Sequence, residues 1–315
     1  MPGRISGVKG WRAWRSLGRA VVLAAVVACL GMSSPPADPE ILATFRDATR
    51  LAVDPLGNIY VIDRGAGRLI RLSVDGRRIE IGGPGADVPE PSAVDPTNGL
   101  FVVVADRASG SLFQFSRDMA PIGPLGSGTV RAPLSTRDDA GERGVGSASG
   151  RRTSADDITV GREGDIFILD SRARHVVRLD PYYRMERVIG GFDDGNDALA
   201  EPVSLCMDDD GTLFVADNGP KEIVAFDMHG ARTNSRPLTG EESIRALRCD
   251  PGARLVVRET MIDLVSETEI RQIVLDVPTD AELRDVARIG DDFLILTPRH
   301  LYRTSGPANL RTAAE

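Results

Sequence analysis

The chain has 315 residues, a formal net charge of −8 at pH 7 and only 5% aromatic residues. Residues 1–31 contain five basic side chains and no acidic one, so removing those five positive charges leaves −13 on the remainder. A body this acidic is a poor nucleic-acid binder, because phosphate contacts need Lys and Arg. Both Trp residues, Trp11 and Trp14, lie in this first segment, which disfavours a sugar-binding surface built on flat aromatic rings.

The N-terminal segment is typical of an export signal. A basic stretch precedes an apolar run at 20–30, which is shorter than the roughly 20 residues that a membrane-spanning helix needs. Residues 26–29, Val-Val-Ala-Cys, resemble a bacterial lipobox, whose Cys is lipidated and becomes the new N-terminus. We therefore expect a signal peptide over 1–29 with a lipid on Cys29, and a linker over 30–39. The other interpretation is an ordinary signal peptide, cut just downstream of an incidental Cys.

The rest of the chain contains a repeat with a spacing of about 40 residues, apart from one insertion. Its most regular part is an apolar strand, found as NIYVID (58–63), LFVVVAD (100–106), DIFILD (165–170), TLFVAD (212–217), ARLVVRE (253–259) and DFLILTP (292–298). Each copy follows one short strand and precedes another, and several copies show a fourth. Four short strands per unit, separated by turn signals, predict the blades of a β-propeller.

Two copies carry a family resemblance. PSAVDPTNGLFVVVADRASGSLFQFS and PVSLCMDDDGTLFVADNGPKEIVAFD resemble NHL repeats, and the likeness extends over 41–305. It implies an all-β, six-bladed β-propeller of four-stranded blades over 40–305, followed by a tail at 306–315. In the fifth copy Glu259 stands where the first four copies end on Asp, and most copies lack the usual loop Asn.

The ends of the propeller predict how the ring closes. The sixth copy stops at its third strand, HLYRTS, whereas an unassigned strand, EILATF at 40–45, precedes the first copy. We expect this N-terminal strand to complete the sixth blade from outside, since closure removes the free edges of an open sheet. A lipid on Cys29 would then hold the propeller close to the membrane.

Four second strands end on Asp63, Asp106, Asp170 and Asp217, at the face that also receives the connections between blades. A short carboxylate at a strand end caps backbone N–H groups of the following turn. We therefore expect these four residues to be mainly structural. The alternative is a ring of carboxylates that attracts a cation to the axis.

An insertion at 124–152 enters the same face and is rich in Gly, Ser and Arg. It has no periodic pattern of apolar residues, so we expect it to be flexible and to become ordered when it binds a partner. Its charged candidates for that contact are Arg131, Arg137, Asp138, Asp139, Arg143, Arg151 and Arg152. The alternative is a surface insertion without function, since loop length costs little stability.

No cofactor is predicted, with one candidate metal site left open. Oxygen-bearing side chains at Asp193, Asp194, Asn196 and Asp197 suit calcium or another divalent metal. Their spacing differs from an EF-hand loop, and Gly- and Asp-rich linkers ending in Pro also join blades in NHL proteins. The alternative is therefore a plain linker.

Catalytic motifs are not evident. Zinc-dependent lyases of this fold hold their metal on His residues from separate blades, and this chain has three, His175, His229 and His300. His229 lies in a hairpin turn expected on the opposite face, so we do not expect a three-His zinc site. Neither a nucleophile elbow nor a phosphate loop is present.

Two Cys residues remain beyond Cys29. Cys206 and Cys249 lie in the first strands of neighbouring repeats. Side chains alternate between the two faces of a strand, so the two thiols point to opposite sides of their own blades. In one of the two possible arrangements they face each other between the blades. An exported protein would oxidise such a pair. The alternative is two buried thiols, because apolar inner strands commonly hold Cys.

These observations favour an exported, lipid-anchored and non-catalytic propeller of the bacterial cell envelope. We expect it to be a protein-binding or scaffolding subunit with one or more envelope protein partners and no nucleic acid. The expected location is the outer membrane, facing the periplasm or the cell surface. The alternative is a metal-dependent lyase or hydrolase that acts at the central channel. A third interpretation is a structural subunit packed edge-on in an assembly.

Overall fold

The computed structural model describes residues 39–74, 77–96, 100–126, 153–191, 195–273, 277–278 and 282–306. Several predicted features lie outside these residues: the signal peptide with Cys29, most of the insertion, and the C-terminal tail. Outside them are also the candidate residues Arg131, Arg137, Asp138, Asp139, Arg143, Arg151, Arg152, Asp193 and Asp194, together with the side chain of Asn196. Within the described residues, no helix has the length and hydropathy of a membrane span.

The described strands form six antiparallel sheets of four strands each, which are the blades of a six-bladed β-propeller. Blade 1 contains β2 (Ala48–Val53), β3 (Ile59–Asp63), β4 (Arg68–Leu72) and β5 (Arg78–Ile81), and blade 2 contains β6 (Pro91–Asp95), β7 (Phe101–Asp106), β8 (Ser111–Ser116) and β9 (Pro121–Pro124). Blade 3 contains β10 (Asp157–Val160), β11 (Ile166–Asp170), β12 (His175–Leu179) and β13 (Met185–Gly190), followed by the 3₁₀ turn η1 (Gly195–Asp197).

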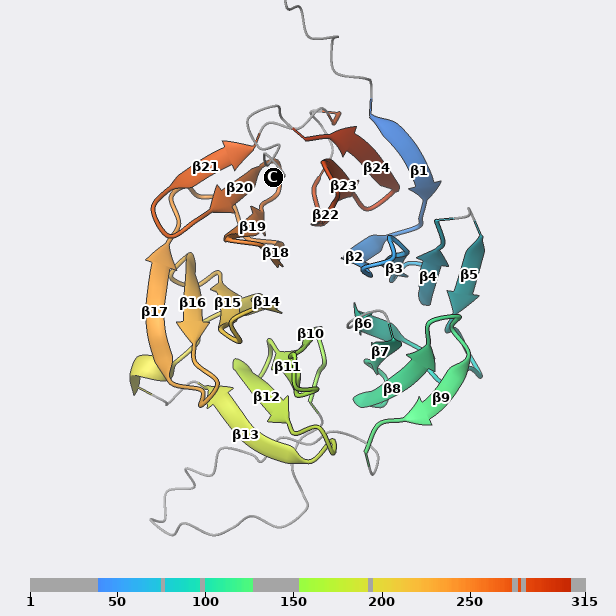
Figure 1. The fold of residues 1–315 in the computed structure, drawn as a ribbon, viewed down its shortest axis with the longest axis horizontal. Helices are drawn as coiled ribbons and strands as arrows, with labels where there is room; N and C mark the ends of the chain where they lie inside the picture. The colour runs from blue at the N-terminus through green and yellow to red at the C-terminus, as the bar shows by residue number, and fades with distance from the viewer. Residues whose placement is uncertain are drawn as a thin grey trace, which may run out of the picture. The chain divides into compact units, whose positions relative to one another are not determined.

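Blade 4 contains β14 (Pro202–Met207), β15 (Leu213–Asp217), β16 (Glu222–Phe226) and β17 (Arg232–Pro237), and blade 5 contains β18 (Ala246–Asp250), β19 (Ala253–Val257), β20 (Ile262–Val265) and β21 (Ile270–Ile273). Blade 6 contains β22 (Asp285–Ile289), β23 (Asp292–Leu296), β24 (His300–Ser305) and β1 (Glu40–Thr44). Figure 1 shows the first strand of every blade nearest the axis.

Strand β1 closes the ring. It pairs antiparallel with β24 at the outside of blade 6, where Glu40 lies opposite Arg303 and Thr44 opposite His300. The N-terminal segment of the propeller therefore shares a sheet with its C-terminal strands (Figure 1). This confirms the predicted fold, including closure by an outer strand from the N-terminus.

The core lies between blades rather than at the axis. The second strands β3, β11 and β15 are buried at every position, because both faces of each strand pack against a neighbouring blade. One cluster, for example, joins Phe167 and Leu169 of blade 3 to Leu213 and Val215 of blade 4. This explains why the second strands are the most regular part of the sequence repeat.

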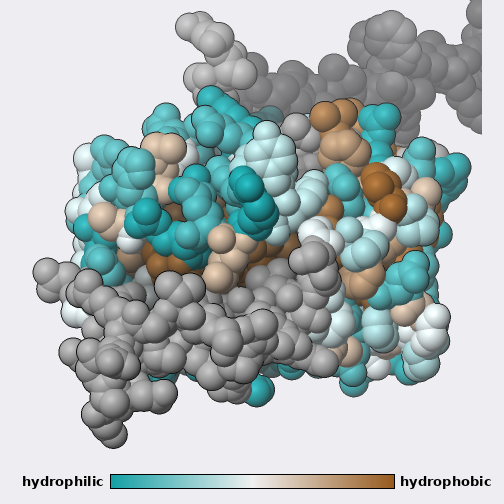
Figure 2. Space-filling model, turned by 90° about the horizontal axis from the view of Figure 1, so that it is seen from below, coloured by the Kyte–Doolittle hydropathy of each residue, from teal (hydrophilic) through white to brown (hydrophobic). Residues whose placement is uncertain are grey.

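The side of the ring shown in Figure 2 is mainly hydrophilic, with hydrophobic side chains between the hydrophilic ones. The large apolar side chains that are exposed come from outer strands and turns of different blades, such as Leu100, Ile122, Tyr182 and Met228.

Blade 5 departs from the prediction at the end of its second strand. The carbonyl of Val257 accepts from the N–H of Arg245, as the carbonyl of Leu169 accepts from Asp156 in blade 3. Arg258, not Glu259, therefore takes the place of the strand-ending Asp. The Arg258 side chain is only 1% exposed, and its Nε lies 2.8 Å from Asp263 Oδ2, so a buried ion pair replaces the carboxylate cap.

Candidate functional site

The four strand-ending carboxylates face the backbone. Asp63 accepts from the N–H groups of Arg46 and Asp47, both at 2.9 Å, and from Ala66 at 3.2 Å. Asp217 does the same in blade 4, accepting from Ala200 and Glu201 at 2.7 Å. Each carboxylate thereby ties the segment entering its blade to the turn leaving the second strand.

Asp106 and Asp170 make equivalent contacts in blades 2 and 3. Asp106 accepts from the N–H groups of Glu90 at 2.7 Å and Ser109 at 2.8 Å. Asp170 accepts from those of Ser154 and Ala173 at 2.9 Å. All four carboxylates are buried, so their oxygens serve backbone donors instead of lining the open face.

Arginines line the open face in their place. Arg64 follows Asp63, Arg107 follows Asp106, and Arg172 stands two residues after Asp170. These three side chains are exposed, and they surround the axial opening together with half-buried arginines from the first-strand region of blades 1, 5 and 6. We call this set the arginine mouth: Arg50, Arg64, Arg107, Arg172, Arg245 and Arg284. It lines a cavity of about 520 Å³ that also includes Ser154, Asp156 and Asn218.

Only part of this positive charge is neutralised. Arg245 pairs with Glu259 at 2.7 Å, and Arg284 with Glu282 at 3.3 Å. Arg107 lies 3.7 Å from Asp156, a longer contact. Arg64 and Arg172 form no ion pair with any described residue.

The electrostatics of Arg64 show the crowding of like charges. Burial lowers the pKa of Arg64, the nearby Arg107 lowers it further, and Asp47 opposes both. In addition, the Nε atoms of Arg50, Arg245 and Arg284 are buried and have no hydrogen-bond partner among the described residues. A guanidinium binds a carboxylate or phosphate in bidentate geometry through accessible N–H groups, which the exposed Arg64 and Arg172 supply.

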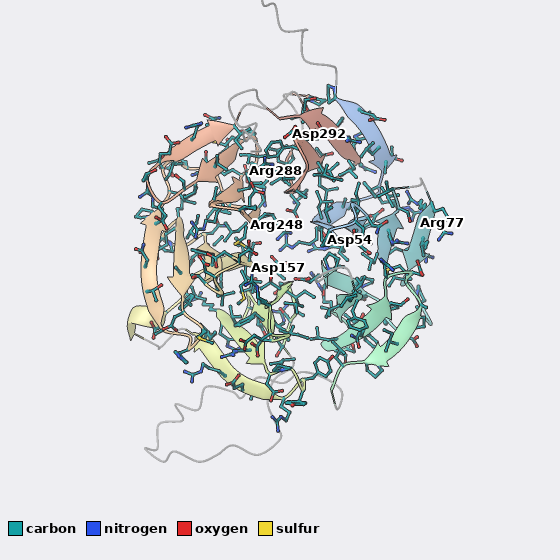
Figure 3. The ribbon with its side chains drawn as sticks, in the orientation of Figure 1. Asp54, Arg77, Asp157, Arg248, Arg288 and Asp292 are labelled. Atoms are coloured by element: carbon teal, nitrogen blue, oxygen red, sulfur yellow. A yellow bond between two sulfur atoms is a disulfide. The ribbon has the colours of Figure 1, made fainter. Side chains whose placement is uncertain are left out.

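The channel below the mouth is filled by a balanced network of charges. Arg248 on β18 donates to Asp285 on β22 and lies 3.6 Å from Asp157 on β10. Arg50 reaches across from β2, with its Nε 3.8 Å from Asp157 and its Nη2 3.1 Å from the carbonyl of Val203. Figure 3 shows Asp157 and Arg248 on inner strands, directed toward the centre of the ring. Two guanidinium groups and two carboxylates thus form the floor of the mouth.

Burial and opposite charges compete in this network: burial raises the pKa of Asp285, although Arg248 and Arg50 act to lower it. Burial opposes the charged form of Arg248, but the carboxylates of Asp285 and Asp157 outweigh it and raise the pKa of Arg248. Asp285 also accepts from the N–H of Leu51 at 2.8 Å. Asp157 accepts from Ser204 Oγ at 2.6 Å. Because both carboxylates already serve cationic and neutral donors, they are unsuited to share a divalent metal ion.

Those candidate metal-binding residues that the structure describes are not brought together. Among the described residues, no group of three or more His, Cys, Asp or Glu side chains is arranged to hold a metal ion. His175 and His300 begin the third strands β12 and β24, whereas His229 lies in the turn between β16 and β17. Asp197, the described carboxylate of the candidate calcium loop, accepts from the N–H of Arg232 at 3.0 Å.

Cys206 and Cys249 form a disulfide between β14 and β18, with their Cα atoms 5.6 Å apart. It joins the inner strands of blades 4 and 5 at the end of the channel opposite the arginine mouth. There it lines a second cavity, of about 280 Å³, with residues such as Asp250 and Arg288. Of the two arrangements left open by the sequence, the structure has the paired one.

Sequence reasoning missed the arginine mouth. The sequence contains a partial indication of it. The residue after the strand-ending Asp is Arg in blades 1 and 2, and Arg172 stands two residues after the strand-ending Asp of blade 3. Of the other three arginines, Arg245 and Arg284 both stand immediately before the first strand of their blade, whereas Arg50 lies within β2. Only the closed ring brings the six side chains to one opening.

Comparisons with known proteins show the fold. No protein-family model matches the chain, so the NHL resemblance stays a prediction, and no curated protein matches it in sequence. Among solved structures, a gluconolactonase from Xanthomonas campestris is 17% identical, with a TM-score of 0.61 and coverage of 88% of this chain and 96% of that one. A putative gluconolactonase is 12% identical, with a TM-score of 0.64 and coverage of 87% and 93%.

A catalytically inactive virginiamycin B lyase from Staphylococcus aureus, solved with quinupristin, is 11% identical to this chain. Its TM-score is 0.56, and the match covers 82% of this chain and 80% of the lyase. At these identities the likeness concerns the six-bladed propeller alone. The chain therefore has a fold that enzymes of the gluconolactonase and virginiamycin B lyase type also use.

Proposed function

We propose that this protein is an exported, lipid-anchored NHL-type propeller that acts as a protein-binding subunit of the cell envelope, with the arginine mouth as its binding site. The observation that carries the proposal is the division of charge on one face. The carboxylates at the strand ends are used by the backbone, whereas Arg64 and Arg172 remain without ion pairs among the described residues. The site fits a partner segment that presents carboxylates.

The surrounding charge supports selectivity for such a partner. The body of the chain is strongly acidic, with −8 on the whole sequence, and the arginine mouth is a positive region within it. An isolated positive opening steers an acidic segment to one place and disfavours its binding elsewhere on the same surface. Arg also keeps its charge at every physiological pH and binds a carboxylate through two parallel hydrogen bonds.

The test is affinity purification from native membranes with a C-terminal tag and a mild cross-linker. The chain is compared with the double variant Arg64→Glu/Arg107→Glu, which reverses two charges of the mouth. The control Arg117→Glu/Arg162→Glu makes the same change in net charge at turns of the opposite face; Arg162, for example, is 79% exposed. A stoichiometric envelope protein should be recovered with the original chain and the control, and be lost from the mouth variant.

The same eluate distinguishes the alternative, a metal-dependent lyase or hydrolase that acts at the channel. Its support is that solved neighbours of the fold carry enzyme names. The channel residues fit it poorly, because Asp157 and Asp285 are engaged by Arg248 and by neighbouring donors. A solitary chain carrying one tightly held metal ion would overturn the binding proposal and favour this enzyme.

A further inference from the structure

A further cavity, separate from the one beside the disulfide, continues the arginine mouth outward between blades 1 and 2. It has a volume of about 600 Å³ and shares four lining residues with the mouth: Thr49, Arg64, Ser92 and Arg107. We call it the blade 1–2 cleft. Figure 1 shows the inner strands β2 and β6 near the axis and the outer strands β5 and β9 at the rim. A cavity that joins the mouth to this gap therefore runs away from the axis.

The chemistry of the wall changes along this path. At the inner end lie Arg64 and Arg107. Farther out the wall is made of small and apolar residues from the turn after β3 and from the connection between the blades: Ile62, Ala66, Gly67, Gly83, Pro84, Pro89 and Pro91. Glu90 is the single acidic residue among the described lining residues. A ligand that fills both cavities therefore needs carboxylates at one end and apolar groups at the other.

We propose that the partner segment is an extended peptide, which places acidic side chains in the arginine mouth and apolar side chains in the blade 1–2 cleft. This inference rests on the proposed function, since it specifies the ligand of the same site. An extended chain rises about 3.3 Å per residue and presents neighbouring side chains to opposite sides. It can thus reach from the axis into a narrow cleft while placing only some side chains against the proline rings.

Ala66 offers a way to close the cleft and leave the mouth unchanged. It lines the cleft but not the mouth, and its backbone N–H donates to Asp63, a contact that any side chain permits. Ala66→Trp should therefore fill the cleft. Ala173 is the matched control, because its N–H donates to Asp170 at the equivalent turn of blade 3. Ala173→Trp adds the same ring away from the cleft.

The probes are fluorescein-labelled synthetic peptides, measured by fluorescence polarisation on the purified chain. One contains Glu-Asp-Glu-Gly-Leu-Pro-Leu, a second has the reverse order, and a third replaces both Leu and the Pro with Ser. One of the first two should bind at least about tenfold more tightly than the Ser peptide, since a buried Leu side chain contributes about this much. Ala66→Trp should abolish that difference, and Ala173→Trp should preserve it. Unfolding in urea verifies that both variants fold, and the pair Ala66→Leu and Ala173→Leu replaces them if either does not.

The outcomes separate this inference from the function on which it rests. Equal binding of the Leu and Ser peptides, unaffected by Ala66→Trp, would overturn the extended-peptide inference and leave the acidic partner in place. Failure of every acidic peptide to bind would overturn the proposed function itself. Decanoate, a simple carboxylate with an apolar tail, serves as a competitor. If it binds in a manner sensitive to Ala66→Trp while no peptide binds, the ligand is a small amphipathic acid and the peptide assignment is wrong.

Discussion

Neighbouring charged residues on this propeller have two different roles: carboxylates cap backbone N–H groups, and arginines line the axial opening. A carboxylate such as Asp63 is short and can accept from two or three backbone N–H groups while remaining buried. The guanidinium of Arg64, one residue later, has only donors and cannot satisfy those N–H groups. It therefore extends into the axial opening, and the same local sequence supplies a structural cap and a guanidinium group that lines the arginine mouth.

Tyr60 gives a prediction at this scale. Its hydroxyl is buried and lies 3.2 Å from Asp54 Oδ2. Burial and the neighbouring Asp54 raise the pKa of Tyr60 to about 12, and Arg71 opposes them. In the unfolded chain its pKa is about 10. The raised value means that Tyr60 stabilises the fold fully below pH 10 and that this contribution is lost as the pH rises toward 12.

Urea unfolding at pH 9 and at pH 11.5 measures that loss. Between these pH values the original chain should lose about 2 kcal/mol of unfolding free energy more than Tyr60→Phe, which has no hydroxyl to ionise. The two proteins differ only in this hydroxyl, so the contributions of all other groups cancel in the comparison. Parallel pH profiles for the two proteins would show that the Tyr60 hydroxyl ionises at its ordinary pKa.

At the scale of strands and turns, the unit that holds one blade to the next is the end of the second strand. Asp217 illustrates it, because the carboxylate accepts from Ala200 and Glu201 before β14 and from Gly219 after β15. Asn218 adds a second clamp, donating to the carbonyl of Ile244 at 3.1 Å and accepting from its N–H at 2.7 Å. The connections on both sides of blade 4 are therefore fixed by two consecutive residues.

Removing one such cap should cost stability. Asp217→Ala leaves three backbone N–H groups without their acceptor, and an unsatisfied buried donor costs about 1 to 3 kcal/mol. We expect the free energy of unfolding to fall by about 2 to 4 kcal/mol in urea denaturation. Asp209→Ala is the control: its side chain is 85% exposed, and we expect a change below about 0.5 kcal/mol. Equal effects of the two substitutions would mean that Asp217 does not cap the turn.

The strands could be predicted because their apolar pattern recurs in every blade. The arginine mouth could not, because its six residues do not follow that repeat. Each second strand is buried on both faces, so its apolar run and its terminal Asp recur and reveal six blades. Blade 5 misled the alignment because its first two strands join through a two-residue turn after Asp250, and its second strand stops at Val257. As a result Arg258, and not the expected Glu259, occupies the position of the strand-ending Asp. Arg245 and Arg284 share the position before the first strand of their blades, but Arg50 and the three arginines that follow the second strands occupy other positions, so only the closed ring shows that all six meet.

At the scale of the whole propeller, closure depends on contacts between the two ends of the described chain. Strand β1 pairs with β24, and the N–H of Phe45 donates to the carbonyl of Arg299 at 2.8 Å. Phe45 is itself buried, in the cluster that joins blade 6 to blade 1. The arginine mouth takes residues from blade 6 as well as from blade 1, so ring closure also brings these arginines together.

A shortened chain tests this dependence. A chain that begins at residue 39 keeps β1, whereas one that begins at residue 46 lacks it and exposes the edge of β24. We expect the shorter chain to lose at least about 2 kcal/mol of unfolding free energy and to associate in solution, because an open strand edge pairs with other chains. Urea unfolding and analytical ultracentrifugation measure the two effects. A synthetic peptide of residues 39–46 should restore the monomer by pairing with β24. If both chains are equally stable and monomeric, β1 contributes nothing to closure, and the two blades meeting at the seam hold the ring by their apolar packing alone.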